Sequence, residues 1–183
     1  MSTIKVNNLQ HPVSANANIS LDANGNIGIG TSLPSFASGG GIQVKNSSTT
    51  NIRVSSGTNT GFDFSQDTSG NSYVYNRDNG YLAFGANNTE RMRVDTSGNL
   101  GLGVTPSAWA SNYKSLDLPS TGAIASAGNS TGIYMNCYEN ASGNFIRRTA
   151  NYATAYVQNY GATGQHQWWI AGSSTAGSTI SFT

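Results

Sequence analysis

A short pattern that occurs twice constrains the fold of this chain more than any other feature of its sequence. The first copy begins at Asp22 and the second at Asp95, so the copies lie 73 residues apart. Each copy reads Asp-x-x-Gly-Asn, then apolar-Gly-apolar-Gly, then a Pro-Ser stop, and each follows a short alternating run. Asp and Asn side chains bond to their own backbone and Gly adopts positive φ, so the first part has the chemistry of a turn. Each copy therefore predicts a β-hairpin.

The second strand of each predicted hairpin has apolar residues on one face and only glycine on the other. Because side chains alternate between the faces of a strand, Gly28 and Gly30 share a face in the first copy, as do Gly101 and Gly103 in the second. Glycine inside a strand has an entropic cost and usually marks the close approach of another backbone. We interpret these four positions as the places where copies of the chain approach one another around an axis.

The charge balance of the chain excludes several classes of function. Charged residues make up 9% of the chain and the formal net charge is +1, so the basic surface of a nucleic-acid binder or a polybasic membrane binder is absent. No segment approaches the ~20 apolar residues of a membrane span, and no basic-then-apolar signal sequence is found. The single Cys137 cannot form an internal disulfide, and we expect it to be a small buried or half-buried residue.

The alternating pattern of short apolar runs predicts an all-β fold. No window shows the sustained i, i+3, i+4 apolar spacing of a helix, whereas short alternating runs lie between clusters of Gly, Asn and Ser. A strand and a hairpin follow the first module but not the second, so we expect the second module to continue beyond Thr183. The predicted parts are an N-terminal strand (1–17), a first hairpin unit (18–35), a first β module (36–91), a second hairpin unit (92–107) and a second β module (108–183).

The N-terminal segment has the features of a strand that adds to another sheet. Ile4 and Val6 lie on one face of the alternating run, and Leu9 offers a further apolar contact. His11-Pro12 ends the run, and no sequence-adjacent partner strand is evident. Because an unpaired strand edge is a template for β-augmentation, we predict that residues 1–17 anchor the chain to another protein.

Two local patterns resemble functional motifs and are better explained as turns. Residues 128–132 fit the Gly-x-Ser-x-Gly motif of α/β-hydrolases, and Glu139 and His166 follow in the chain order that those enzymes use. The motif requires a turn from a strand into a helix, and no helix is predicted here. The segment from Asp22 resembles the start of a calcium loop, which requires Gly at position 6 and Glu at position 12. Here Gly is at position 4 and Leu33 is at position 12, so we expect no metal site and no cofactor.

The eight acidic residues are scattered, and none forms an evident catalytic pair. Asp63 and Asp67 are the nearest candidates for the closely placed acids that glycan cleavage needs. Asp63 stands between Phe62 and Phe64, which is more simply explained by the solvent face of a strand. We therefore predict that the chain is not an enzyme.

An aromatic cluster near the C-terminal end allows two interpretations. Its members could form a sugar-stacking platform, or they could pack in the core and at a subunit interface, where Trp and Tyr are common. Because adjacent residues in a strand point to opposite faces, at most one of the two tryptophans lies on the outer surface. We favour packing and keep glycan stacking as the alternative. The cluster consists of Trp168, Trp169, Tyr152, Tyr156, Tyr160 and His166.

Two segments resemble a known family of viral proteins. Residues 90–103, ERMRVDTSGNLGLG, resemble the ERMRIDSSGNVGIGT segments that recur in bacteriophage tail fibre and tailspike-like proteins. Residues 2–10, STIKVNNLQ, resemble the start of such fibres in marine, cyanophage-type phages. The module from Trp109 to Thr183 is also similar to modules of these fibres.

The resemblance implies an elongated homotrimeric fibre of short β modules joined by the repeated Asp-x-x-Gly-Asn hairpins. It implies a structural virion component, the particle-proximal part of a tail fibre that serves host attachment. Residues 1–17 would dock to the phage tail or to an adaptor or nozzle protein. No receptor tip or autocleaving chaperone domain is evident, so contact with a host surface receptor is expected from parts outside this chain.

Three other functions remain open at this point. A capsid head fibre or decoration protein would use the same N-terminal strand on a different platform. A carbohydrate-binding adhesin module would use Trp168 or Trp169. A glycan-degrading tailspike would require two carboxylates facing one cleft. For the chain itself we expect no nucleic-acid partner and no membrane insertion.

Overall fold

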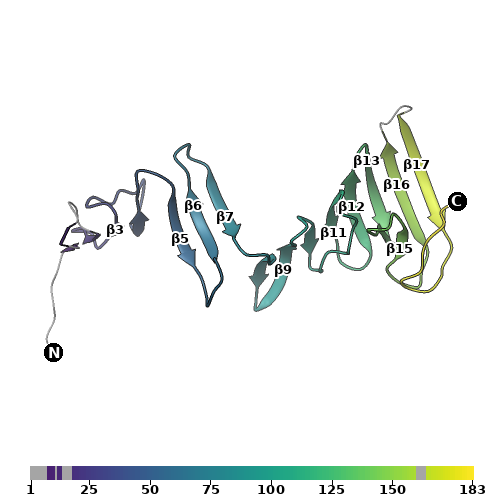
Figure 1. The fold of residues 1–183 in the computed structure, drawn as a ribbon, viewed down its shortest axis with the longest axis horizontal. Coiled ribbons are helices and arrows are strands. Elements are labelled where there is room, and N and C mark those ends of the chain that lie inside the picture. The colour runs from purple at the N-terminus through teal and green to yellow at the C-terminus, as the bar shows by residue number, and fades with distance from the viewer. Residues whose placement is uncertain (1–7, 11, 14–17, 160–163) are drawn as a thin grey trace. The chain divides into compact units, whose positions relative to one another are not determined.

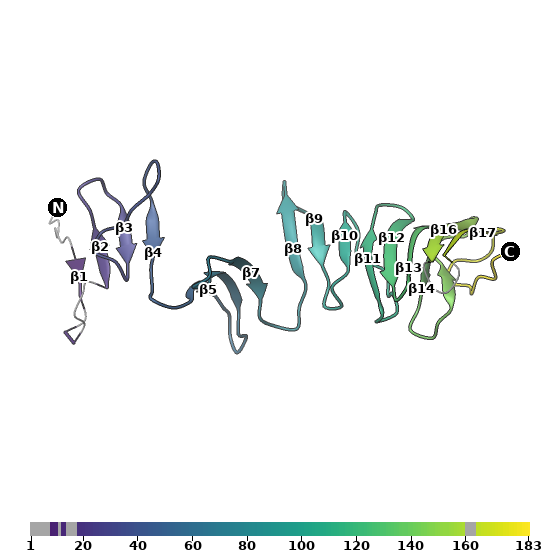
Figure 2. The same ribbon diagram turned by 90° about the horizontal axis from the view of Figure 1, so that it is seen from above.

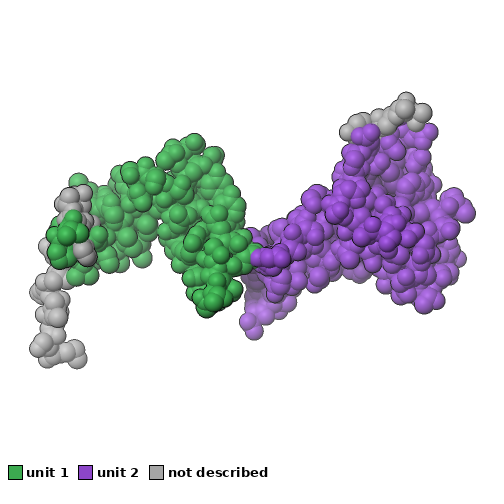
Figure 3. All heavy atoms as spheres, in the orientation of Figure 1, with its two compact units in different colours: residues 1–78 green, residues 79–183 purple. Residues whose placement is uncertain are grey.

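The computed structural model describes residues 8–10, 12, 13, 18–159 and 164–183. These residues form strands, turns and loops without any helix, which confirms the all-β prediction. Within this part of the chain, no helix is available that could cross a membrane. The chain divides into two compact units, residues 1–78 and residues 79–183 (Figure 3).

The first unit contains two small sheets (Figures 1 and 2). In the four-stranded sheet, β1 to β3 pair antiparallel, and β4 pairs parallel to β3. The three-stranded sheet is an antiparallel meander of β5 to β7. The strands are β1 (Asn8–Leu9), β2 (Ile19–Leu21), β3 (Ile27–Ile29), β4 (Ile42–Val44), β5 (Thr50–Val54), β6 (Phe62–Gln66) and β7 (Ser72–Asn76).

The second unit is built on one eight-stranded sheet in the order β17-β16-β13-β12-β11-β10-β9-β8 (Figure 2). Only the pair formed by β10 and β11 is parallel. A separate hairpin joins β14 to β15. The strands are β8 (Leu82–Ala86), β9 (Thr89–Val94), β10 (Leu100–Leu102), β11 (Tyr113–Asp117), β12 (Gly122–Ala127), β13 (Ser130–Met135), β14 (Cys137–Glu139), β15 (Phe145–Arg147), β16 (Ala153–Asn159) and β17 (Gln165–Ala171).

The module predicted at residues 36–91 is not a unit of the structure. β4 pairs with β3 of the first hairpin, and β8 pairs with β9 of the second. The boundaries predicted at 35/36 and 91/92 therefore cut through sheets. The physical reason is that a hairpin strand leaves one row of backbone donors and acceptors unpaired, and the neighbouring chain segment satisfies it.

The turn chemistry occurs four times in the described residues, twice as often as predicted. In each turn, Oδ1 of the first side chain accepts hydrogen bonds from the backbone N–H groups two and four residues later. The fourth residue is a glycine with φ between 77° and 86°. Two of the turns lack the apolar-Gly sequence that made the pattern visible. The four turns begin at Asp22, Asp67, Asp95 and Asn140.

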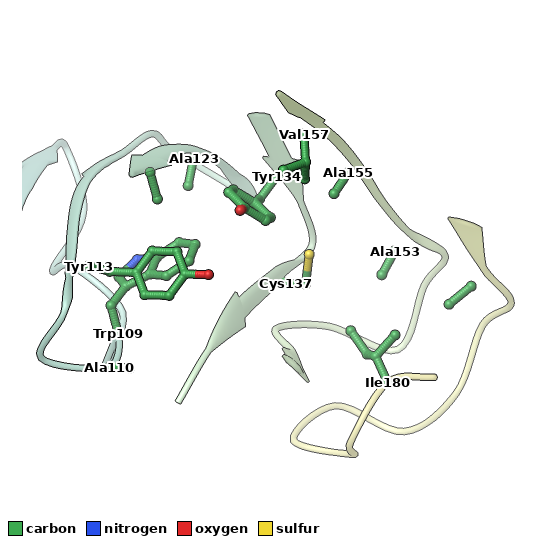
Figure 4. Packing of buried hydrophobic residues seen from close by; sticks show 12 residues of the cluster. Trp109, Ala110, Tyr113, Ala123, Tyr134, Cys137, Ala153, Ala155, Val157 and Ile180 are labelled. Atoms are coloured by element: carbon green, nitrogen blue, oxygen red, sulfur yellow. The ribbon is translucent and has the colours of Figure 1, made fainter. Parts of the chain in front are cut away.

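The buried apolar side chains of the described residues all belong to the second unit. They lie between one face of the sheet, the β14–β15 hairpin and the C-terminal segment (Figure 4). Trp109 packs edge-on against Tyr134 with ring centroids 5.4 Å apart. Cys137 is fully buried, as predicted, and burial raises the pKa of its thiol to about 12. The second unit thus has a hydrophobic core within a single chain.

A buried carboxylate ties this core together. Asp117 accepts hydrogen bonds from the Trp109 indole Nε1 (2.8 Å) and from the backbone N–H of Ser107 (2.8 Å). The Arg148 guanidinium completes the cluster at 3.0 Å, and both charged side chains are largely buried. Because removing one partner of a buried ion pair leaves an uncompensated charge, Asp117 holds the segment before β11 to the loop after β15.

Candidate functional site

The glycines predicted to mark a trimer contact are explained by the chain's own loops. A Cβ atom on Gly28 would lie 2.3 Å from the carbonyl oxygen of Thr31, and one on Gly101 would lie 2.0 Å from that of Val104. The predicted close approach is therefore present, but the approaching backbone belongs to the same chain. Gly30 and Gly103 lie just beyond β3 and β10 and have φ of 73° and 66°, which a left-handed bend requires. These four positions give no evidence for a neighbouring chain.

Substituting Gly101 by Ala is expected to destabilise the single chain. The new Cβ would clash with the carbonyl of Val104, and overpacking of this kind costs about 1–3 kcal/mol. Thermal melting followed by circular dichroism measures the loss. Gly172→Ala is the matched control, because a Cβ at Gly172 meets no atom within 4 Å. Equal melting midpoints for the two variants would contradict the intrachain explanation.

The predicted N-terminal anchor is only partly within the described residues. Ile4 and Val6 lie outside them. Leu9 belongs to β1 and is 56% exposed, and it pairs with Ile19 of β2. The expectation that residues 1–17 lack a sequence-adjacent partner strand is therefore wrong for Asn8–Leu9, because these residues pair antiparallel with β2, the next strand along the chain. β1 remains at the end of its sheet.

The two candidate acids are not a catalytic pair. Asp63 is fully buried rather than on a solvent face, because arginines from both sides fold over it. Arg53 Nε lies 2.7 Å from its Oδ1 and Arg77 Nε lies 2.8 Å from its Oδ2. The hydrogen bond from Arg53 holds the pKa of Asp63 well below its usual range. Hydrogen bonds, first from Asn71, lower the pKa of Asp67 to about 2, so both acids are ionised and neither is suited to donate a proton.

The Gly-x-Ser-x-Gly pattern does not form a nucleophile elbow. Its residues lie in the turn from β12 to β13 and at the start of β13, and no helix follows. Glu139 accepts a hydrogen bond from the Tyr113 hydroxyl at 2.8 Å, and His166 contacts Tyr156 instead. The described residues contain no cluster of His, Cys, Asp and Glu that could hold a metal ion. The side chain of Asp22 is bonded within its own turn.

The adjacent tryptophans lie on opposite faces of β17, as the alternation predicted. Trp169 packs against Phe145 and Phe182, with ring centroids 5.5 Å and 5.4 Å away. Trp168 is 79% exposed and lies 4.4 Å from the Tyr156 ring. The Tyr156 hydroxyl in turn contacts His166 Nδ1. Of the other cluster members, Tyr152 is exposed and Tyr160 lies outside the described residues.

Trp168 belongs to a continuous row of apolar side chains that the sequence analysis did not identify. The strand register aligns one residue from each of the eight strands on the face opposite the core. Each side chain is apolar or aromatic, and the row ends at Trp168. We call it the eight-strand row, and its members are Leu82, Val94, Leu100, Leu116, Ile124, Ile133, Tyr156 and Trp168.

The sheets of the first unit show the same arrangement. Ile19 and Ile29 align on one face of the first sheet, and Ile52, Phe64 and Val74 align on one face of the second. All five side chains are exposed. The buried positions among the described residues of this unit are occupied by polar residues and glycine. Both sheets therefore lack an apolar layer against which to pack.

Comparisons with protein-family models, with curated proteins and with solved structures gave no match for this chain. The function proposed below therefore depends on the chain itself, namely on the sequence resemblance described above and on the exposed apolar residues of its sheets.

Proposed function

We propose that the chain is a structural virion component, the particle-proximal part of an elongated homotrimeric phage tail fibre. It would attach through residues 1–17 to the tail or to an adaptor or nozzle protein and serve host adsorption without catalysis. The observation that carries the proposal is the first unit, whose two sheets have exposed apolar faces and no buried apolar side chain among the described residues. In the proposed fibre, neighbouring chains complete the core of this unit.

The energetic argument concerns the cost of ordering the backbone. Fixing each residue costs about 1–2 kcal/mol in conformational entropy, and burial of a Val, Ile or Phe side chain returns about 1.5–3 kcal/mol. Small sheets without a packed face are at best marginally stable. Exposed side chains such as Ile52, Phe64 and Val74 provide the missing burial when chains associate.

The number of chains and the viral role come from the sequence resemblance. Residues 90–103 resemble tail-fibre segments, and these fibres are homotrimers. The structural role is supported by the turns, whose side chains are engaged within the turns themselves. The candidate catalytic residues support a non-enzymatic role, because Asp63 and Asp67 are separately bonded.

A carbohydrate-binding adhesin is the second candidate, and one observation favours it. Trp168 and Tyr156 lie beside His166 and Gln158, and the latter two line a cavity of about 270 Å³. Exposed rings next to polar groups suit a sugar. A capsid head fibre or decoration protein is the alternative within viruses, because it would differ only in its docking platform.

The test has two readouts on the same protein. Sedimentation of the purified chain at micromolar concentration is expected to give the mass of three chains, and a stable monomer with a cooperative melt would contradict the proposal. Gold-labelled antibodies against residues 79–183 are expected to mark the tails of purified particles of the phage that encodes the chain. Label on capsids would favour the head fibre, and particles without label would exclude a virion component.

A further inference from the structure

We infer that the eight-strand row is the surface through which copies of this chain contact one another in the second unit. The inference rests on the proposed homotrimer and adds the interface that the glycines do not provide. It assigns one face of one sheet, with named residues, to a second copy of the chain.

The first step is that the two faces of the sheet are not equivalent. One face is covered by the chain itself, through Trp109, Tyr134 and the segment around Ile180, which are all buried. On the other face Ile124, Ile133 and Trp168 are 43%, 51% and 79% exposed, and the other five members of the row are half-buried. Contiguous exposed apolar surfaces of this kind mark interaction sites.

The second step concerns the charge of this face. The eight-strand row contains no charged side chain, so the rows of symmetry-related copies can meet without like-charge repulsion. The row also offers no positive charge to bind a nucleic acid or an acidic peptide. The adjacent row on the same face is polar and forms a rim, as interfaces between proteins commonly have. The register aligns Lys114, Ser126, Thr131, Gln158 and His166 in this rim.

The third step identifies the partner as the same chain. Both sheets of the first unit, like the sheet of the second unit, carry exposed apolar residues aligned on one face. A second copy running alongside supplies a matching apolar face to each sheet in the same order, whereas an unrelated protein would have to match each sheet separately. Identical chains can associate along their length when each sheet carries an apolar face of the same kind, as the sheets of this chain do.

The fourth step is the size of the surface. Eight strands about 4.8 Å apart give the row a length of roughly 35 Å. A second, partly apolar row on the same face widens it, with Phe84, Met92, Leu102, Met135 and Ile170. Rows on one face of a strand lie about 7 Å apart, so these two rows and the polar rim cover roughly 35 Å by 20 Å. This area of about 700 Å² is close to the ~800 Å² per partner that a stable, specific interface buries.

The experiment measures the reactivity of single cysteines in the full chain. Ile133→Cys places a thiol in the middle of the row, and Ser142→Cys places one in the exposed turn between β14 and β15. The native Cys137 is fully buried, so the unmodified chain gives the baseline. We expect a charged, water-soluble thiol reagent to modify Cys at 142 at least tenfold faster than Cys at 133 in the assembled protein. The difference is expected to disappear in denaturant.

A second readout does not require a substitution in the row. Iodide quenching of tryptophan fluorescence is measured for the unmodified chain and for Trp168→Phe, and the difference reports the accessibility of Trp168. We expect Trp168 to be protected in the assembled protein. Trimers with a reactive Cys at 133 and a quenchable Trp168 would overturn the interface while leaving the trimer intact, and would free Trp168 for glycan stacking. A monomeric chain would overturn the proposed function itself.

Discussion

Replacing Phe64 by Asp is expected to convert the assembled protein into single chains. Phe64 is 53% exposed in one chain and lies in the apolar row of the three-stranded sheet, between Ile52 and Val74. In the proposed trimer the substitution buries an unpaired carboxylate in each of three chains, and desolvating an unpaired charge costs several kcal/mol. Sedimentation at micromolar concentration should show the mass falling from three chains to one.

The matched control for this variant places the same charge on the opposite side of the same sheet. Asn51 is exposed and lies on the face that carries Arg53 and Asp63. Asn51→Asp should leave the mass and the melting midpoint close to those of the unmodified chain. If the Phe64 variant sediments like the control, the apolar faces of the first unit are not the contacts between chains.

Asp117→Asn is expected to cause the largest loss of stability among single substitutions in the second unit. The change removes the charge that compensates Arg148, whose side chain is only 11% exposed. Breaking a buried ion pair on one side typically costs about 3–5 kcal/mol, which corresponds to a fall of more than about 10 °C in the melting midpoint of a unit of this size. The measurement is thermal denaturation at fixed protein concentration, followed by near-UV circular dichroism of the core aromatic residues.

Glu90→Gln provides a comparison within the same unit. Glu90 is bonded to Arg93 with Nε–Oε1 of 2.6 Å, but both side chains are partly exposed. Surface ion pairs contribute little to stability, so this variant should melt close to the unmodified chain. A fall as large as that of Asp117→Asn would mean that burial of the carboxylate is not what makes Asp117 important.

The fold class could be predicted because it depends on local patterns. Alternation of apolar and polar residues defines each strand, and the Asp-x-x-Gly-Asn residues define the turns at Asp22 and Asp95. Strand pairing could not be predicted in the same way. β4 pairs parallel to β3 across a connecting segment, and nothing in the alternation of either strand specifies this partner.

In the candidate sites, too, the features that depend on neighbouring residues could be predicted, and those that depend on residues far apart in the sequence could not. Alternation correctly placed Trp168 and Trp169 on opposite faces. The burial of Asp63 depends on arginines ten and fourteen residues away, which a strand pattern does not reveal. The eight-strand row was missed because its members come from eight strands, and only the register aligns them.

The uneven distribution of buried apolar side chains between the two units gives the chain a direction of folding. Residues 79–183 have a core of their own and can become ordered in a single chain before any encounter with another. Residues 18–78 have no such core among the described residues, so in the proposed trimer their ordering would await association and would depend on protein concentration. Ordering would then proceed from the C-terminal unit towards the N-terminus, and the segment proposed to dock on the particle would be completed last. With this order, a chain that has not yet assembled would lack an ordered docking segment and would not occupy an attachment site on the particle.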